Sequence, residues 1–173
     1  MRHAFVYLLM AISMTSCGFQ LRQPVVLAAP LHHPYIKTAA PYNALARNLR
    51  DYFKMSGITV ASSPEQASII LDILEESESQ QLLSVSSNQQ SRQYNLIVKV
   101  TFQLTDIKGN ILVPKQSVSE IRSLPIQSNQ ILGGSNEAQS VYQQMWLAIV
   151  YDIANYLASR DTTRMLTKHA SSL

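Results

Sequence analysis

The sequence has little charge, one cysteine and no long apolar run, and each of these scarcities excludes a class of protein. Charged residues make up 14% of the 173 residues, with 14 Lys and Arg against 11 Asp and Glu. Because no basic stripe is interleaved with aromatic residues, the pattern does not indicate a nucleic-acid binder. No segment approaches the roughly 20 apolar residues that a membrane-spanning helix needs. The apolar content of 46% nevertheless predicts one folded domain with a core.

The common catalytic and metal-binding motifs are also missing. The chain contains no G-x-S-x-G, no H-E-x-x-H and no phosphate-binding loop. His32 and His33 are adjacent but have no Cys or Glu at metal-ligand spacing, which favours loop residues over a zinc site. Glu75, Glu76 and Glu78 lack the spacing of a calcium loop, and an exposed strand end suits them better. We therefore expect a protein that is not an enzyme and holds no metal.

The first sixteen residues have the three-part pattern of a signal peptide. Arg2 precedes an apolar run from Ala4 to Met14, and small polar residues follow as far as Ser16. A run of this length is too short to span a bilayer. We expect residues 1–16 to be removed, which leaves Cys17 at the start of the mature chain.

Cys17 is the only thiol, so it cannot close a disulfide within the chain, and three other uses compete. A buried free thiol disagrees with its place ahead of the core, and a catalytic thiol needs a basic partner that no Cys-His pattern supplies. The third use is lipidation, because "MTSC" at residues 14–17 resembles the bacterial lipoprotein box, with Met14 in place of the usual Leu. The resemblance implies S-diacylglycerol and an N-linked acyl chain on Cys17, with no other cofactor. Gly18 follows where an Asp would favour inner-membrane retention, which implies the outer membrane, periplasmic side.

The mature chain begins with a proline-rich stretch. Residues 17–34 predict a lipidated N-terminus and a tether, with a short edge strand near residues 25–29 where flanking prolines are tolerated. A helix follows, for which Asn43 is a suitable N-cap and Gly57 a suitable C-terminal stop. Its apolar residues recur every four positions: Leu45, Leu49 and Phe53.

Strand patterns occupy the middle of the chain. A β-branched and aliphatic run starts a strand near Ala67. Residues 91–107 alternate apolar and mostly polar side chains, the signature of a strand with one buried face. Gly109 and Asn110 then turn the chain, and the next strand contains Pro114, which predicts a bulge or an edge. The six apolar positions of the alternating strand are Tyr94, Leu96, Val98, Val100, Phe102 and Leu104.

A final helix is predicted from Asn136, which forms a capping box with Gln139, after a loop made flexible by Gly133 and Gly134. One broad apolar face predicts packing against a core. Its members are Ala138, Val141, Tyr142, Met145, Ile149, Ile153, Tyr156 and Leu157. The polar residues 161–173 predict a flexible C-terminal tail.

These elements predict a two-layer α+β sandwich spanning residues 25–160 as a single domain. Four strands form a mostly antiparallel or mixed sheet, and two helices pack on one of its faces. The other face is expected to be more polar and open to water or to a partner.

With its elements placed, the chain resembles the LPS-assembly lipoprotein LptE family, also called RlpB. "CGFQLR" from residue 17 is similar to the mature start of that family, and "NALARNLRDYFKMSGITV" to its first helix and exit. "RQYNLIVKVTFQLTDIKGN" is similar to its long central strand. Together the three stretches place the resemblance over almost all of residues 17–158.

The resemblance implies an outer-membrane lipoprotein that plugs the LptD β-barrel in a one-to-one complex, helps assemble it and assists lipopolysaccharide transport and insertion into the outer leaflet. Basic residues near the sheet tip and before the last helix bind lipopolysaccharide in the family. This sequence departs from that pattern, because its loop "QILGGSNE" has no Lys. Arg92 at the tip and Lys99 on the polar strand face are the candidates for phosphate contact, with a solvated Arg92 as the alternative.

A second function stays open beside the barrel partner. A free-standing outer-membrane lipoprotein of this fold would bind a lipid, or another envelope complex, between sheet and helices. Co-purification with a large barrel protein separates the two hypotheses.

Overall fold

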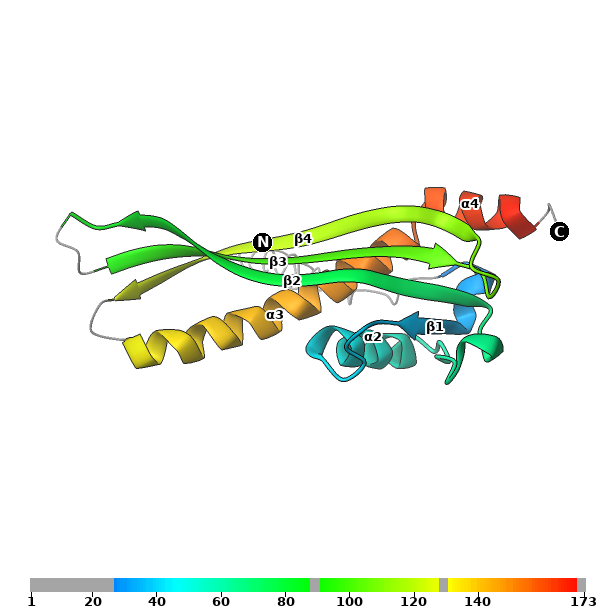
Figure 1. Cartoon of the computed structure of the whole chain (residues 1–173), viewed down its shortest axis with the longest axis horizontal. Helices are drawn as coiled ribbons and strands as arrows, with labels where there is room; N and C mark the ends of the chain where they lie inside the picture. Colours follow the sequence, from blue (N-terminus) through cyan, green and yellow to red (C-terminus); the bar gives the residue numbers. More distant parts are fainter. Residues whose placement is uncertain (1–26, 88–90, 128–130, 171–173) are drawn as a thin grey trace, which may run out of the picture.

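The computed structural model describes residues 27–87, 91–127 and 131–170. Its four strands form one mixed sheet in the order β1-β2-β3-β4, in which β1 is parallel to β2 and the other pairs are antiparallel. The helices α2 and α3 lie on one face of this sheet (Figure 1), which confirms the predicted α+β fold. The elements in chain order are η2 (Ala29–His32), β1 (Pro34–Lys37), α2 (Ala44–Met55), η3 (Pro64–Gln66), β2 (Ile69–Val85), β3 (Ser91–Thr105), β4 (Ile111–Gln127), α3 (Ile131–Leu157) and α4 (Arg160–Ala170).

The first helix, α2, begins and ends as its sequence predicts. The backbone N–H of Ala46 donates a 2.9 Å hydrogen bond to Oδ1 of Asn43, which satisfies one of the free donors at the helix start. Gly57 follows the helix with a φ of 75°, a conformation that favours glycine. The predicted apolar stripe is fully buried: Leu45, Leu49 and Phe53.

The predicted edge strand at residues 25–29 is wrong. Residues 25 and 26 lie outside the described part of the chain, and Ala29 opens the 3-10 turn η2 instead. The edge strand is β1, which pairs with residues 69–72 of β2. Pro30 stands at the start of the turn, where its fixed φ suits the bend, whereas Pro34 opens β1, where the missing N–H is tolerated.

The strands β2, β3 and β4 form a long antiparallel meander. Two irregularities interrupt the pairing of β2 with β3, between Ile73 and Glu75 and between Leu82 and Ser84. A third lies in β4 between Val113 and Gln116, around Pro114, which confirms the predicted bulge. β3 spans Ser91–Thr105 and buries its alternate apolar residues from Leu96 to Leu104 as predicted, whereas Tyr94 near the tip is only partly buried.

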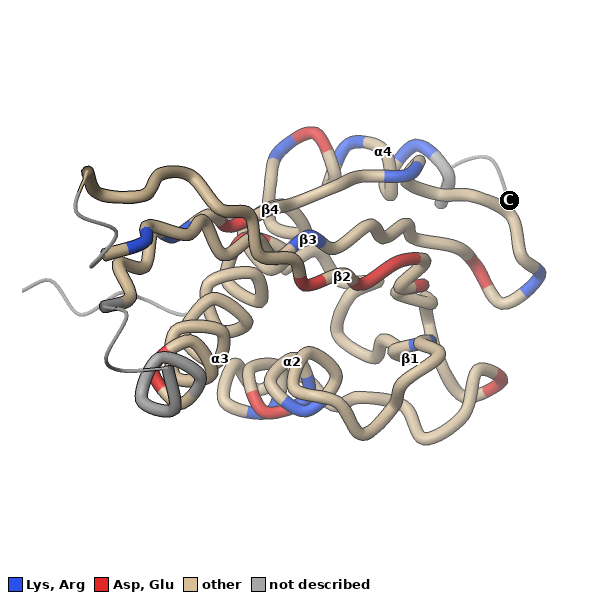
Figure 2. The backbone as a smooth tube through the Cα atoms, turned by 60° about the vertical axis from the view of Figure 1, so that its left-hand side comes forward, with Lys and Arg blue, Asp and Glu red and all other residues tan. Residues whose placement is uncertain are grey.

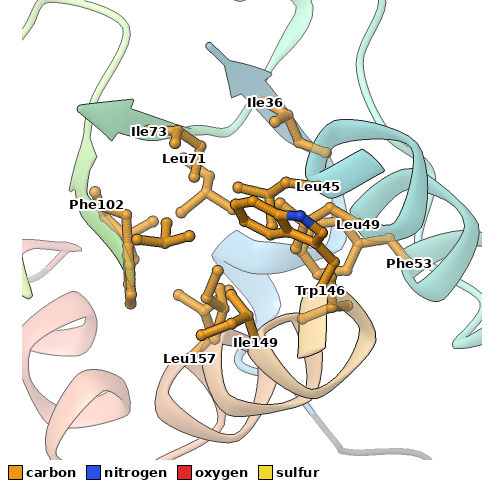
Figure 3. Packing of buried hydrophobic residues seen from close by; sticks show 14 of the residues in the cluster. Ile36, Leu45, Leu49, Phe53, Leu71, Ile73, Phe102, Trp146, Ile149 and Leu157 are labelled. Atoms are coloured by element: carbon orange, nitrogen blue, oxygen red, sulfur yellow. The ribbon is translucent and has the colours of Figure 1, made fainter. Parts of the chain in front are cut away.

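The helix α3 begins five residues earlier than predicted, at Ile131, and runs through Gly133 and Gly134. A glycine in a helix interior costs roughly 1 kcal/mol, which weakens a helix without ending it. The predicted stripe packs on the sheet, with Met145, Ile149, Ile153 and Leu157 fully buried and the other four members partly buried. Figure 3 shows side chains of α2, α3, β1, β2 and β3 meeting in this single core.

The predicted flexible tail is also corrected by the structure, because residues 160–170 form the helix α4 beside β4 (Figure 1). Ser159 caps this helix by accepting a 3.2 Å hydrogen bond from the N–H of Thr162. Leu166 is 3% exposed and joins the core, and Thr162 is fully buried. The apolar contacts of Leu166 and Met165, the Ser159 cap and a 2.8 Å hydrogen bond from the Thr162 hydroxyl to the backbone oxygen of Tyr156 therefore hold a segment whose composition is polar.

The described helices are not candidates for crossing a membrane, since none is both long and apolar enough. Within the described residues, every buried side-chain polar atom has a hydrogen-bond partner. The core that the described residues form extends from Leu27 to Leu166, and its buried polar side chains are satisfied.

Candidate functional site

Arg92 lies at the tip of the sheet, where the hairpin of β2 and β3 ends. It is exposed, and its neighbours across the two ladders are Val85 of β2 and Ile126 of β4. Arg92 shares the helix-covered face with Leu96 and Val98, because side chains two residues apart point the same way. The side chain is thus a cation at the far end of the apolar face.

Exposed apolar residues surround this cation on β2. Leu82, Leu83 and Val85 are 55%, 57% and 46% exposed, although all three lie within β2. β2 continues past the part that β1 and α2 cover, so its last residues meet solvent. A cation next to uncovered apolar side chains is the pairing that a phosphorylated lipid requires, because phosphate needs charge and an acyl chain needs apolar surface.

Lys99, the second predicted phosphate contact, lies on the opposite face of β3. It is exposed and stands between Ser77 of β2 and Ser119 of β4. Seven residues separate it from Arg92, which places the two about 23 Å apart along the strand at roughly 3.3 Å per residue. The structure therefore does not bring the two candidates into one site.

The face that carries Lys99 is open and mostly uncharged, as predicted. Cross-strand pairs of small polar residues line it, with hydrogen bonds of 3.0 Å between Thr101 and Ser117 and 2.8 Å from Ser123 to Asn95. An apolar pair, Ile97 and Ile121, interrupts the polar ladder. The remaining uncharged polar members are Ser77, Ser79, Gln81, Gln93, Gln103 and Ser119.

The carboxylates of β2 play a part that the sequence did not reveal. The bulge at Leu74 reverses the alternation of the strand, so Glu76 and Glu78 fall opposite Val100 and Val98 on the helix-covered face. Nothing in the letter pattern marks this bulge. The prediction of an exposed strand end is wrong in position, because Glu75, Glu76 and Glu78 lie well inside β2. Glu75 and Glu78 are exposed as expected, but the prediction misses the contacts that follow.

Glu76 and Glu78 tie the sheet to both helices. Thr38 donates a 2.8 Å hydrogen bond to Oε1 of Glu76, and the amide of Asn43 donates to Oε2. Trp146 of α3 donates from Nε1 to Oε1 of Glu78 at 2.5 Å. A small cleft of about 380 Å³ lies among these groups. Because the carboxylates already accept these bonds, we interpret them as a structural clamp.

Tyr142 extends the clamp along α3 by donating a 3.1 Å hydrogen bond to the backbone oxygen of Ser79. Burial, and then the charge of Glu78, raises the pKa of the Tyr142 phenol above its ordinary value. Two exposed carboxyls shift the other way: hydrogen bonds from Asn110 and Ser63 lower the pKa of Asp106 and Glu65, respectively. These groups lie in separate elements, so no acid–base pair forms among them.

The described residues also hold no group of three or more His, Cys, Asp or Glu that is placed to bind a metal. His32 is exposed, and its Nε2 lies 3.1 Å from the backbone oxygen of Leu27. Cys17, the predicted lipid anchor, falls outside the described residues.

A second, more apolar groove of about 650 Å³ lies between α2 and α3 on the outside of the helical layer. Met55, Leu147 and Tyr151 are exposed there, at 76%, 46% and 39%. The rings of Tyr52 and Tyr151 meet edge to face with centroids 5.5 Å apart. The space between sheet and helices is filled by the core, so this outer groove is where the helical layer offers apolar surface.

Comparison with known proteins gives consistent matches. The family model described as "LptE: Lipopolysaccharide-assembly" matches residues 32–157, so α4 lies outside the match. "LPS-assembly lipoprotein LptE" of Yersinia pestis (strain Pestoides F) is 26% identical over 177 residues, covering 100% of this chain and 81% of the relative. The protein of the same name from Yersinia enterocolitica is 27% identical over 126 residues, covering 70% of this chain and 58% of the relative.

Solved structures share the fold. Uncharacterized lipoprotein B from Nitrosomonas europaea superposes with a TM-score of 0.67 at 22% identity and covers 88% of this chain and 96% of its own. A minor lipoprotein from Acinetobacter baumannii gives a TM-score of 0.60 at 20% identity and covers 77% of this chain and 93% of its own. At these identities the likeness concerns the fold.

Proposed function

The chain belongs to the LptE lipopolysaccharide-assembly family, and from that premise we propose that it plugs the LptD outer-membrane β-barrel and helps assemble it. In the same complex, formed one to one, it assists lipopolysaccharide transport and insertion into the outer leaflet. This role is structural and involves no catalysis.

The observation that carries the proposal is the face of the sheet opposite α2 and α3, which is mostly polar and carries few charges, among them Lys99 and Glu75. Wide outer-membrane barrels have a polar interior, which an apolar surface would not enter. The exposed hydroxyls of Ser117, Ser119 and Ser123 offer hydrogen-bonding groups whose desolvation costs less than that of charges. This face therefore suits contact with a polar lumen wall.

The tip supports a contact with lipopolysaccharide itself. Arg92 supplies a charge for a phosphate group, and Leu82 and Val85 supply apolar surface for acyl chains. Lys99, on the other face, is a second and separate phosphate contact. Arg92 therefore carries the greater part of the proposed binding.

Cys17 completes the proposal as a lipid anchor that carries S-diacylglycerol and an N-linked acyl chain. Each buried methylene contributes about 0.8 kcal/mol, so several chains hold a protein on a membrane essentially for good. The anchor places the protein on the periplasmic side of the outer membrane, where a barrel partner is accessible.

The apolar groove between α2 and α3 favours the alternative of a free-standing lipoprotein. Exposed Met55 and Leu147 offer surface to a lipid or to another envelope complex. We rank this function second, because the groove lies on the outside of the helical layer and offers fewer polar groups to a partner than the sheet face does.

The deciding experiment is co-purification from detergent-solubilised outer membranes. The plug hypothesis expects one copy of this protein with one large barrel protein. A Ser119→Trp variant, which places a large ring on the open face, should reduce that yield, while Ser62→Trp in an exposed loop should not. Monomeric migration of the wild type in detergents that preserve barrels would overturn the proposal.

A further inference from the structure

One end of the sheet brings together three segments that are far apart in the sequence. Ser68, just before β2, donates a 2.6 Å hydrogen bond to the backbone oxygen of Pro30. Ile70 of β2 pairs with Thr105, which in turn pairs with Ile111. The first described residues, the β3–β4 turn and the start of β4 therefore share one end, and α4 lies beside β4 there (Figure 1).

The β3–β4 turn exposes two large apolar side chains at this end. Ile107 and Ile111 are 57% and 55% exposed. Oδ1 of Asp106 accepts 2.8 Å hydrogen bonds from the N–H groups of Lys108 and Asn110, so the turn is held rigidly from within. The ordered turn thus holds the Ile107 and Ile111 side chains exposed to solvent, away from the core.

Cations cluster around these isoleucines. Residues 106–118 and 159–168 contain five Lys and Arg but only two carboxylates, Asp106 and Asp161. Arg160, Arg164 and Lys168 follow each other at intervals of four residues, which places them along one side of α4. All are exposed, and Lys115 of β4 is exposed as well.

The two carboxylates neutralise only part of this charge. Asp161 lies 3.6 Å from Arg164, with both side chains about four-fifths exposed or more, at 85% and 79%. Such a surface pair is weak, so the arginine stays available to another anion. Asp106 is occupied by its own turn, where it accepts three hydrogen bonds from Lys108 and Asn110.

Acidic and basic residues lie on different sides of the molecule, and this asymmetry would orient it on an anionic surface. Glu75, Glu76 and Glu78 lie on β2, two strands away from the edge that carries Lys115 and α4. Figure 2 shows acidic positions along β2 and basic positions along α4. An anionic surface would attract the α4 side and repel the β2 side, so approach would favour one orientation.

The proposed anchor reaches the same end. Ten residues separate Cys17 from Leu27, the first described residue, so the lipid attachment lies within about 35 Å of Leu27 even for an extended chain. A membrane surface that holds the anchor is thus within reach of α4 and the β3–β4 turn, and it is remote from the tip that carries Arg92.

We propose that the basic end, defined as Ile107, Lys108, Ile111, Lys115 and the Arg160–Arg164–Lys168 side of α4, binds anionic glycerophospholipid headgroups in the leaflet that holds the anchor. The cations contact phosphates, and the two isoleucines enter the headgroup boundary. The inference rests on the proposed lipid anchor for the identity of the leaflet, but it goes beyond the proposed function because it requires neither a barrel nor lipopolysaccharide. The helix α4 also lies outside the family match.

The test uses the chain from Gly18 to Leu173, which lacks the acylated residue and keeps the whole core of residues 27–166. It is mixed with phosphatidylethanolamine vesicles that contain or lack phosphatidylglycerol, and bound protein is measured by flotation. Binding should require phosphatidylglycerol and fall as salt is raised, because salt screens exposed charges. Arg164→Gln combined with Lys168→Gln should lower the partition coefficient on the order of tenfold, and Ile107→Ser with Ile111→Ser should lower it at constant charge.

Arg47→Gln combined with Lys54→Gln is the matched control, since it removes the same charge from exposed positions of α2. This control should bind as the wild type does, and circular dichroism should show every variant folded. The proposal is overturned if the α4 and α2 variants lose binding equally, if neutral vesicles bind equally well, or if only lipopolysaccharide micelles are bound. None of these outcomes bears on co-purification with a barrel, so the two proposals fail separately.

Discussion

The indole Nε1 of Trp146 in α3 donates a 2.5 Å hydrogen bond to Oε1 of Glu78 in β2. The indole itself is 7% exposed and belongs to the core, whereas Glu78 is exposed at the sheet edge. The Trp146 side chain thus links the helical layer to β2, beyond the part of this strand that pairs with β1.

Trp146→Phe should lower the free energy of unfolding by about 2 kcal/mol, because it removes a bond to a charged group and leaves a gap in the core. Urea unfolding measures the change. Gln143→Ala, at an exposed position of the same helix, should stay within about 0.5 kcal/mol of the wild type. Equal stability of the two variants would show that the indole contact contributes nothing.

Alkaline pH should destabilise the protein partly through Tyr142. Burial and the charge of Glu78 raise the pKa of this phenol in the folded state, so the folded chain holds the proton more tightly than the unfolded chain. The associated stability is complete below the unfolded pKa of about 10 and is lost as pH rises through the folded value.

Tyr142→Phe should therefore lose less stability than the wild type when urea midpoints are compared from neutral to strongly alkaline pH. Tyr42→Phe, at a ring that is 83% exposed, should follow the wild-type curve. Parallel curves for Tyr142→Phe and the wild type would contradict the linkage.

Leu166→Ala should destabilise the protein by about 2–3 kcal/mol and speed amide hydrogen exchange throughout α4, because Leu166 is 3% exposed and anchors this helix. The exposed neighbour Thr167→Ala serves as the control, with a smaller effect expected. Rapid exchange of α4 already in the wild type would restore the prediction of a flexible tail.

Arg92→Glu should reduce lipopolysaccharide binding by about tenfold or more, because it replaces a phosphate partner with a like charge beside exposed Leu82 and Val85. Capture on immobilised lipopolysaccharide measures the loss. Lys54→Glu makes the same charge change on α2 and should bind normally, so equal losses would assign the effect to net charge.

Cys17→Ala should abolish metabolic labelling with a fatty-acid probe and release the protein from the membrane anchor. Ser62→Ala, an exposed position outside the lipoprotein box, retains the thiol and should still be labelled. Persistent labelling of the alanine variant would refute the lipid anchor.

Strong local periodicity explains which elements were predictable. The four-residue spacing of Leu45, Leu49 and Phe53 and the alternation along β3 each follow from one buried face, so the letters alone suffice. The four-residue β1 and the polar α4 have no such pattern. They form because β2 offers a pairing edge and because the core accepts Leu166, and both causes lie far away in the sequence.

The candidate site was predictable to a similar extent. The position of Arg92 near the tip is predictable from the sequence, because the alternating pattern of β3 begins beside it, whereas its contact with phosphate stays a prediction. Lys99 lies on the opposite face because an odd number of positions separates it from Arg92 along the strand. The clamp of Glu76 and Glu78 depends on the bulge at Leu74, a backbone irregularity that no side-chain pattern encodes.

The length of the meander has a consequence for distance. β3 has 15 residues, which at about 3.3 Å each span roughly 50 Å, whereas the hydrocarbon core of a bilayer is about 30 Å thick. The basic end and Arg92 stand at opposite ends of this rod. If the proposed lipid holds the basic end at the inner leaflet, the sheet is long enough for Arg92 at its tip to reach the level of the opposite leaflet.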